Sequence, residues 1–320
     1  MLESVVLLVV IGIGVVLVSH LLEILRPEPE APSTLRWAPD IPILYFDDGG
    51  TRVRYVKAGS GPTLVLLHTL RTQLDLFEKV IPALSEDFTV FAVDYPGHGF
   101  SDIPRANYDA EYFSDFVDRM LAGLKLSDVT LVGVSIGGAI SLALAGRKNP
   151  RLSGVVAINP YDYDRGRGLA RSTLLGRMIM LTSGIPIVGG TVMRLRNFLI
   201  IKSIFAGGVA RPDSISPELL GEMYAVGNRR GHYRAFLTLL RRAASWEEQT
   251  NLYANIEVPV LLLWGDRDWS TPEERQHDRS LIPTAESATV TNGGHFLPLD
   301  APTELIAHIR DFHSKRVAAK

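Results

Sequence analysis

The stretch that decides the fold is Val129-Thr130-Leu131-Val132-Gly133-Val134-Ser135-Ile136-Gly137-Gly138. It begins as an apolar, strand-forming run, reaches a serine between glycines, and continues into small residues that favour a helix. Its centre fits the nucleophile elbow G-x-S-x-G, in which a strained turn between a strand and a helix exposes a serine hydroxyl. A side chain at either flanking glycine would collide with a neighbouring strand or helix. The stretch therefore predicts a strand, a sharp turn carrying Ser135, and a helix over residues 139–146.

Apolar runs on both sides of this elbow predict further strands, at residues 63–67, 88–93, 154–158 and 258–264. Strands that are apolar on both faces belong to a sheet covered by helices on both sides. Before them, Asp47-Asp48-Gly49-Gly50 predicts a hairpin turn between strands at 43–46 and 52–56. Between the strands, apolar residues recur at helical spacing over residues 113–124. The alternation predicts an α/β fold with a mostly parallel sheet.

Composition limits the class of protein. The chain has 320 residues, of which 46% are hydrophobic, and a net charge of -2, which suits one large α/β domain or at most two. A near-neutral balance lacks the basic excess of nucleic-acid-binding proteins, so we expect no nucleic acid partner. The absence of cysteine excludes disulfides, thiolate metal sites and a cysteine nucleophile. No metal-binding spacing such as H-E-x-x-H occurs, so we expect no metal site.

The N-terminus departs from a soluble enzyme. Residues 5–18 include no polar side chain, and the apolar stretch continues to Leu25, which as a helix is about 31 Å long and can cross a hydrocarbon core. We predict a membrane anchor over residues 1–25; the alternatives are a cleaved signal peptide, which the lack of a positive start and of a cleavage site disfavours, and a buried helix. Arg26 and Arg36 follow the segment, and no lysine or arginine precedes it, which places the remaining chain on the cytoplasmic side of the membrane.

The rest of the chain divides into a linker, a domain and an insertion. Residues 26–40 begin with a run rich in proline and charge, which is typical of an extended linker. Residues 41–320 form the predicted α/β domain. Within it, residues 161–250 are too long for a simple crossover and are predicted to form a cap over the site.

Taken together, these patterns resemble the α/β-hydrolase fold family over nearly all of residues 41–312. Four segments carry the resemblance: His68 after the third strand, Asp94-Tyr95-Pro96-Gly97-His98-Gly99-Phe100-Ser101-Asp102, the elbow at Ser135, and the pair Gly265-Asp266-Arg267-Asp268 and Gly293-Gly294-His295-Phe296. The family order of nucleophile, acid and histidine implies Ser135, Asp268 and His295 as a catalytic triad that needs no cofactor.

The triad chemistry follows from the residue types. A serine hydroxyl becomes a good nucleophile when a histidine accepts its proton, and a carboxylate holds the histidine in the right tautomer. Asp268 and His295 each follow a predicted strand, at the sheet edge where α/β proteins place their sites. Asp266 and then Asp162 are the alternative acids. We expect His98 to hold its loop in place rather than to act in catalysis.

The loop after the third strand departs from the family pattern. Many members read His-Gly there, whereas this chain has His68-Thr69-Leu70-Arg71. An oxyanion hole needs backbone N–H groups aimed at the developing alkoxide, and we assign those of Leu70 and Ile136. His68, Thr69 and Arg71 are candidate substrate contacts. Thr69 narrows the acyl pocket or supplies its hydroxyl, and Arg71 either meets an anionic group of the substrate or faces water.

These features predict a membrane-anchored serine hydrolase that cleaves a carboxylic ester with a hydrophobic acyl part, from a small molecule or a lipid. The predicted cap has apolar clusters around Met178, Ile187 and Leu199, which suit either an ordinary cap core or a lid that touches lipid. The same triad also supports carbon–carbon bond hydrolysis, perhydrolysis without a cofactor, or acyl transfer. Dehalogenase and epoxide hydrolase activities are disfavoured because the resemblance places aspartate at the position of Ser135 in those enzymes. A non-catalytic receptor or scaffold is the alternative from another class.

Overall fold

The computed structural model describes residues 2–318, and its centre is an eight-stranded sheet with the strand order β1-β2-β4-β3-β5-β6-β7-β8. β2 is antiparallel to both of its neighbours, β1 and β4. The six strands β3 to β8 run parallel to one another, so the sheet is mostly parallel, as the sequence predicts. The strands are β1 (Ile43–Asp48), β2 (Thr51–Ala58), β3 (Thr63–Leu67), β4 (Thr89–Val93), β5 (Val129–Val134), β6 (Leu152–Ile158), β7 (Val260–Gly265) and β8 (Glu286–Val290).

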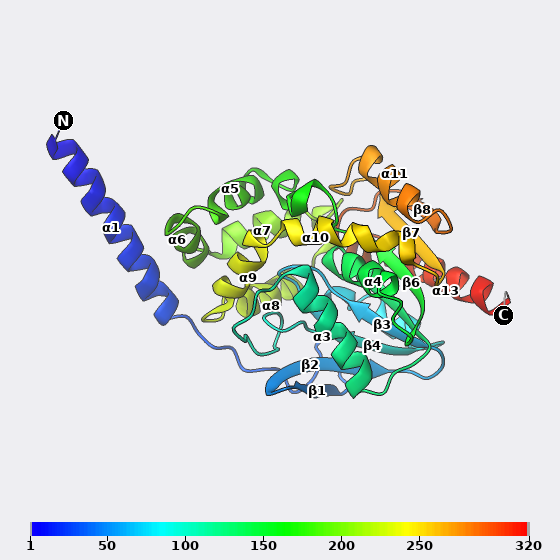
Figure 1. Ribbon diagram of the computed structural model, residues 1–320. Coiled ribbons are helices and arrows are strands. Elements are labelled where there is room, and N and C mark those ends of the chain that lie inside the picture. The colour runs from blue at the N-terminus through cyan, green and yellow to red at the C-terminus, as the bar shows by residue number, and fades with distance from the viewer. Residues whose placement is uncertain (1, 319–320) are drawn as a thin grey trace.

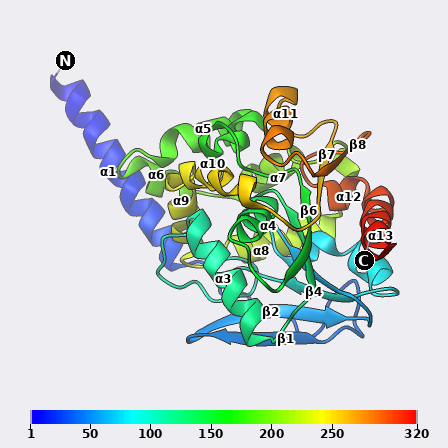
Figure 2. The ribbon, with the colours of Figure 1, turned by 45° about the vertical axis from the view of Figure 1, so that its right-hand side comes forward.

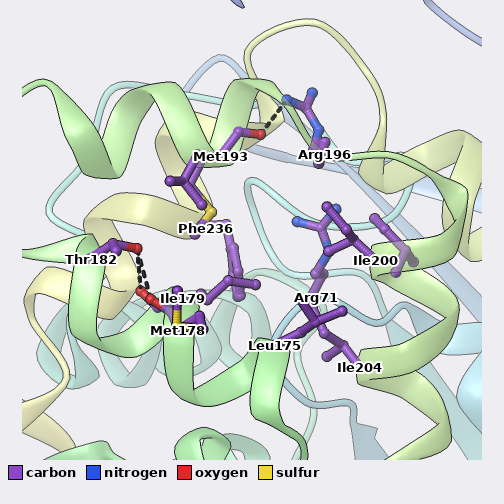
Figure 3. Close-up of a pocket in the computed structure, with 12 residues that line it drawn as sticks. Arg71, Leu175, Met178, Ile179, Thr182, Met193, Arg196, Ile200, Ile204 and Phe236 are labelled. Atoms are coloured by element: carbon purple, nitrogen blue, oxygen red, sulfur yellow. Dashed lines mark hydrogen bonds between the residues drawn. The ribbon is translucent and has the colours of Figure 1, made fainter. Parts of the chain in front are cut away.

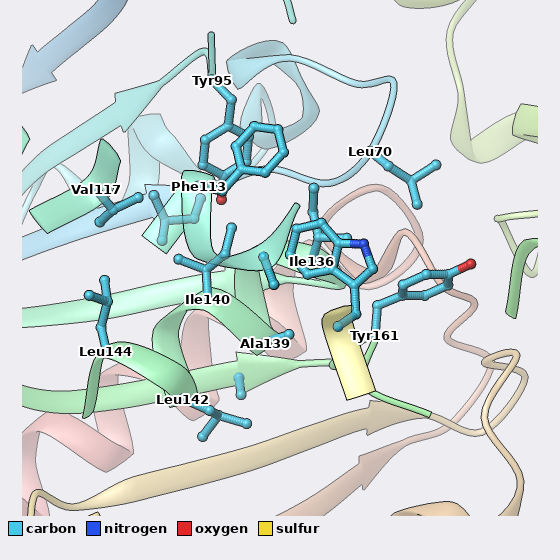
Figure 4. Close-up of a cluster of buried hydrophobic side chains, with 14 of the residues drawn as sticks. Leu70, Tyr95, Phe113, Val117, Ile136, Ala139, Ile140, Leu142, Leu144 and Tyr161 are labelled. Carbon is cyan, nitrogen blue, oxygen red and sulfur yellow. The ribbon is translucent and has the colours of Figure 1, made fainter. Parts of the chain in front are cut away.

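Helices cover both faces of the sheet (Figures 1 and 2). Alternate residues of one strand enter two different cores: Leu131 packs in the core that contains α3 and α4, and Val132 packs in the core that contains α2 and α13. Figure 4 shows the first of these cores, with Ile140 and Leu144 of α4 near Phe113 and Val117 of α3. The domain helices are α2 (Ile81–Leu84), α3 (Ala110–Gly123), α4 (Ile136–Gly146), α11 (Pro272–Leu281), α12 (Leu297–Asp300) and α13 (Pro302–Ala318).

The segment between β6 and β7 is almost entirely helical. It lies between the sheet and the N-terminal helix (Figure 1). Its α-helices are α5 (Leu174–Ser183), α6 (Val188–Arg194), α7 (Phe198–Ala206), α8 (Pro217–Gly227), α9 (His232–Arg241) and α10 (Ala244–Glu248). The short 3-10 helices of the chain are η1 (Leu74–Phe77), η2 (Asp164–Gly166), η3 (Gly168–Arg171), η4 (Pro212–Ser214) and η5 (Gln249–Asn255).

The N-terminal helix α1 (Leu2–Ile24) projects away from the domain (Figure 2). It has 23 residues and a mean hydropathy of 2.9 over its most apolar window, so it is long and apolar enough to cross a membrane, a property that anchors share with signal sequences. Met1, the first residue of the predicted anchor, and residues 319–320, the last of the predicted domain, lie outside the described residues.

The last turns of α1 are docked on the domain, which the sequence did not predict. Ser19 and Glu23 are the two buried residues of the helix. Glu23 Oε2 accepts a hydrogen bond from Arg196 Nη1 at 2.8 Å, Glu23 Oε1 accepts one from the Gly231 N–H at 2.7 Å, and Ser19 Oγ accepts one from Arg194 Nε at 3.0 Å. We expected a spanning helix that adds little to the domain; its buried polar end is instead part of the fold.

The following linker is also held. Arg26 donates to the carbonyls of Arg194 and Arg196 at 2.7 and 2.9 Å, Leu35 is buried, and Trp37 Nε1 donates to Asp75 Oδ1 at 2.8 Å. Residues 26–42 contain no helix or strand. The linker is therefore attached to the domain by these contacts and is not a free spacer.

Candidate active site

The elbow has the strained geometry that its sequence predicts. Ser135 adopts φ 59° and ψ -116°, a conformation that is costly for a residue with a side chain. A Cβ atom at Gly133 would lie 2.0 Å from the Gly137 carbonyl oxygen, and one at Gly137 would lie 2.4 Å from the Leu67 carbonyl oxygen. Only glycine fits at these two positions. The helix α4 begins at Ile136, three residues before the predicted start, because the turn leads directly into it.

Three side chains from three loops form a continuous hydrogen-bonded chain. Ser135 Oγ lies 2.8 Å from His295 Nε2, and His295 Nδ1 lies 2.6 Å from Asp268 Oδ1. Ser135 follows β5, Asp268 follows β7, and His295 follows β8, so parallel strands bring all three to the same edge of the sheet. Ser135 and His295 are buried, at 0% and 1% exposure, which excludes bulk water from the pair. The three residues assigned from sequence therefore meet in space.

The second oxygen of Asp268 is held by its own loop. Asp268 Oδ2 accepts hydrogen bonds from the Ser270 N–H at 2.9 Å and from Ser270 Oγ at 2.5 Å, and Arg275 Nε donates to the same hydroxyl at 2.9 Å. Burial alone raises the pKa of the Asp268 carboxyl, but His295 and the Ser270 donors outweigh it, so the pKa lies below its ordinary value. The carboxylate is therefore ionised at neutral pH.

The two alternative acids lie elsewhere. Asp266 Oδ1 accepts a hydrogen bond from the Gly293 N–H at 3.1 Å and ties together the loops after β7 and β8. Asp162 Oδ2 accepts a hydrogen bond from the Tyr253 hydroxyl at 2.6 Å. Neither carboxylate is hydrogen-bonded to His295, which leaves Asp268 as its acid partner.

Asn159 and Trp269 belong to the site although no motif marks them. Asn159 Nδ2 donates to the carbonyls of Gly294 and His295, each at 3.0 Å, and its Oδ1 accepts from the Gly265 N–H at 2.9 Å, so this side chain, which follows β6, joins the end of β7 to the loop after β8. The Trp269 indole stacks on the His295 imidazole, and its Nε1 donates to the Gly207 carbonyl at 2.8 Å. The signal available for Asn159 was a polar residue directly after the apolar run 154–158.

Two backbone N–H groups face no acceptor in the turn regions beside Ser135. Ile136 is the first residue of α4 and has no intrahelical acceptor for its N–H. Among residues 2–318, the Leu70 N–H forms no hydrogen bond either. The tight contact between Gly137 and the end of β3 places the loop that carries Leu70 next to the elbow. This placement suits the oxyanion hole assigned from sequence.

The neighbouring loop residues differ in their roles. His68 is fully buried; its Nε2 accepts from the Tyr95 N–H at 3.0 Å, and its Nδ1 donates to the Thr69 carbonyl at 2.7 Å. Burial lowers the pKa of His68 to about 3, so His68 is neutral and its hydrogen bonds hold this loop, while its contact with substrate stays a prediction. The Thr69 hydroxyl is buried without a partner among the described residues, and Arg71 is 6% exposed, so Arg71 does not face water.

The loop after β4 is structural, as expected. The Asp94 carboxylate accepts hydrogen bonds from Arg54 Nε at 2.6 Å, from the Leu74 N–H at 2.7 Å and from the Phe100 N–H at 2.8 Å. Burial lowers the pKa of His98 in this loop to about 3. Within residues 2–318, no group of three histidine, aspartate or glutamate side chains could hold a metal ion.

Comparison with known proteins finds relatives of this chain. The sequence model of the alpha/beta hydrolase fold matches residues 62–178. Haloalkane dehalogenase 2 of Mycobacterium tuberculosis is 28% identical over 294 residues, covering 88% of this chain and 96% of that protein. The 2-(acetamidomethylene)succinate hydrolase of Mesorhizobium japonicum is 33% identical over 117 residues, or 37% of this chain and 42% of that protein.

Solved structures agree. The crystal structure of haloalkane dehalogenase DbeA from Bradyrhizobium elkani superposes with a TM-score of 0.77 at 20% identity and covers 88% of this chain and 100% of that chain. The eight-stranded, mostly parallel sheet with helices on both faces is the architecture shared with such neighbours. These matches show that the chain has the α/β-hydrolase fold.

Proposed function

We propose that the chain is a membrane-anchored serine hydrolase that cleaves a carboxylic ester with a hydrophobic acyl part through an acyl-enzyme. The observation that carries this proposal is the hydrogen-bonded chain from Ser135 Oγ to His295 Nε2, at 2.8 Å, and from His295 Nδ1 to Asp268 Oδ1, at 2.6 Å. Both distances lie within the range required of a nucleophile, its base and the group that orients the base.

In the first half-reaction, Ser135 Oγ attacks the ester carbonyl carbon while its proton passes to His295 Nε2. The Asp268 carboxylate stabilises the imidazolium that forms. The negative oxygen of the tetrahedral intermediate accepts hydrogen bonds from the Leu70 and Ile136 N–H groups, whose loss would cost about 2.7 to 4 kcal/mol for one donor. The C–O bond then breaks, and the leaving alkoxide takes the proton from His295.

In the second half-reaction, His295 removes a proton from water, which attacks the acyl carbon. The second tetrahedral intermediate uses the same two N–H groups. Its collapse breaks the bond to Ser135 Oγ, which regains its proton from His295, and releases the carboxylic acid. Both half-reactions use protein groups and water alone, so the proposal includes no cofactor.

The choice of serine chemistry rests on one residue. The relatives include proteins named as haloalkane dehalogenases. For such enzymes, the family resemblance described above implies an aspartate nucleophile. This chain has Ser135, which transfers an acyl group and suits an ester. Carbon–carbon bond hydrolysis, perhydrolysis and acyl transfer to another acceptor use the same triad and are outcomes of the substrate series below.

The hydrophobic acyl part is supported by apolar surface next to α1. Several large apolar side chains of α5, α6, α7 and the turn between α5 and α6 are exposed: Leu174, Leu175, Met178, Leu181, Ile185, Ile187, Val188, Phe198 and Leu199. The helix α1 packs against α6, so this surface lies beside the proposed anchor. Each methylene that enters an apolar pocket contributes about 0.8 kcal/mol. Residues 161–250 are accordingly proposed as a cap that receives the acyl chain.

Retention of α1 is supported by its docked end. A signal peptide is cleaved, whereas Ser19 and Glu23 are buried against Arg194, Arg196 and Gly231. We therefore propose residues 1–25 as an anchor, 26–40 as a packed linker and 41–320 as the catalytic domain, on the cytoplasmic side. A topology reporter fused to the C-terminus tests the side; a periplasmic or luminal signal would reverse the orientation.

The decisive experiment uses the full chain in detergent with a fluorophosphonate probe and p-nitrophenyl esters from acetate to decanoate. We expect covalent labelling at Ser135 and turnover that rises from acetate to longer esters. The Ser135→Ala variant should show neither. Labelling without ester turnover would indicate another reaction on the same nucleophile, and absence of labelling in the wild type would leave a receptor or scaffold as the better explanation.

A further inference from the structure

A cavity of about 220 Å³ lies inside the insertion, enclosed by α5, α6, α7 and α9. Its walls are leucine, isoleucine, valine, methionine and phenylalanine side chains, together with Thr182, Arg71 and Arg196. Thr182 Oγ1 donates to the carbonyls of its own helix and contributes no free polar group. The two arginines are therefore the polar features that a ligand would meet.

The two arginines differ in their partners. Arg196 is satisfied: Nε donates to the Gly227 carbonyl at 3.0 Å, Nη1 to Glu23 Oε2 at 2.8 Å, and Nη2 to the Arg229 carbonyl at 2.9 Å. Arg71 has a single hydrogen bond in the described part of the chain, from Nη2 to the Gly227 carbonyl at 3.3 Å. Its Nε is buried with no acceptor among these residues. Arg71 thus keeps donors free toward the cavity.

Within residues 2–318, Arg71 forms no ion pair with a carboxylate. Its guanidinium lies over the Phe236 ring, 5.0 Å from the centroid, and the charges that act on it are those of Arg196 and Arg26. Burial and these two cations lower the pKa of Arg71 to about 9. The neighbouring Glu23 is already paired with Arg196 and Arg26. An anion in the cavity would find a buried cation with unused hydrogen-bond donors.

Figure 3 shows Arg71 in the middle of the cavity, between Leu175 of α5 and Ile200 and Ile204 of α7. Leu175 and Met178 on the rim are 37% and 51% exposed, so this side of the cavity opens toward solvent and the exposed apolar surface. Arg71 also adopts φ 59°, an uncommon conformation for an arginine. The cavity therefore combines a buried cation with apolar walls.

We propose that this cavity binds an unbranched monocarboxylate, with its carboxylate on Arg71 and its chain between α5 and α7. A planar carboxylate matches the fork of one guanidinium. The cavity lies in the insertion proposed above to receive the acyl chain, so its place in the reaction rests on the proposed function, whereas binding itself is measured without turnover. The acid that the reaction releases and free fatty acid in the membrane share this chemistry.

The test uses the full chain with Ser135→Ala in zwitterionic detergent, so that binding is measured without turnover. A decanoate with a diazirine at its chain end is photo-crosslinked, and the labelled peptides are mapped by mass spectrometry. We expect labels on α5 or α7, displaced by octanoate and about tenfold less well by octanol, which lacks the charge.

Arg71→Met, which keeps an apolar side chain over Phe236, should reduce labelling about tenfold or more. Arg177→Met removes an exposed positive charge from α5 and should leave labelling unchanged. Equal competition by octanoate and octanol, or labels outside the insertion, would overturn the proposal without depending on any variant. Turnover of dodecanoate esters by the wild-type chain is measured separately, with and without added dodecanoate. If the acid product is released into the cavity, dodecanoate should inhibit the wild type but not Arg71→Met. If dodecanoate binds without inhibiting turnover, the cavity takes up free acid from the membrane.

Discussion

The Trp269 indole lies flat against the imidazole of His295, with ring centroids 3.7 Å apart and planes 10° from parallel. Trp269 follows Asp268 directly, so the residue after the acid supports the base that the acid orients. Its Nε1 is fixed by the Gly207 carbonyl in the insertion. An aromatic face stabilises a cation, and His295 becomes a cation each time it accepts the Ser135 proton.

Replacing Trp269 should therefore slow turnover more than it weakens substrate binding. Loss of about 0.5–2 kcal/mol of cation stabilisation predicts a fall in kcat of about 2- to 30-fold for Trp269→Leu, with little change in KM. Steady-state kinetics on a soluble ester such as the butyrate measure both constants. Trp269→Phe keeps an aromatic face and should recover part of the loss; equal kinetics in all three proteins would limit Trp269 to a packing role.

The triad assignment makes a sharper prediction. Ser135→Ala should abolish fluorophosphonate labelling, and Asp268→Asn should lower ester turnover by about 10⁴-fold, because the amide no longer holds the histidine tautomer. Asp266→Asn is the matched control two residues away. Its amide oxygen still accepts from the Gly293 N–H, so the variant should cost less than about tenfold in turnover. A larger loss for Asp266→Asn than for Asp268→Asn would move the acid.

The sequence predicts the sheet and the three triad residues because the signals are local. Strands such as 129–134 are continuous apolar runs, and Ser135 and His295 lie in short glycine-rich motifs. Asp268 could be separated from Asp266 only by resemblance. The structure now gives the physical reason, since Asp268 alone of the two is hydrogen-bonded to His295.

The features that escaped prediction depend on contacts between distant residues. Asn159 binds loops more than 100 positions away, and Glu23 pairs with Arg196 across 173 positions. In the sequence, Glu23 appears as a polar residue that the end of an apolar helix tolerates. The sequence left two alternatives for Arg71, contact with substrate or exposure to water. No local pattern reveals that Arg71 lines a cavity between four helices of the insertion.

The docked end of α1 predicts two different outcomes for two truncations. Deleting residues 2–18 removes the exposed apolar helix but keeps Ser19 and Glu23, and should give a folded, active protein in the soluble fraction. Deleting residues 2–25 leaves Arg196 buried without its carboxylate, and should lower the free energy of unfolding by about 3–5 kcal/mol. Urea denaturation of both proteins measures the difference.

Glu23→Gln in the shorter deletion isolates the charge, because it keeps the volume of the side chain. It should reproduce most of the loss seen on deleting residues 2–25. Equal stability of the two truncated proteins would mean that the ion pair with Arg196 contributes nothing to the domain.

A buried carboxyl pair beside the site predicts how stability depends on pH. Burial raises the pKa of Asp162 to about 6, and burial together with Asp162 raises that of Asp278 on α11 to about 10. In the unfolded chain both groups titrate near pH 4. Between these values the folded protein binds more protons than the unfolded chain, so the free energy of unfolding falls as pH rises.

Asp278→Asn mimics the protonated carboxyl and should flatten this fall between pH 6 and 9, giving a variant more stable than the wild type at pH 9. Denaturation of the full chain in detergent at several pH values measures the slopes, with the exposed Asp213→Asn as the control that should keep the wild-type slope. If Asp278→Asn were to show the same slope as the wild type, the carboxyl of Asp278 would be ionised in the folded protein across this range, and its charge would have to be compensated by the neighbouring Arg279.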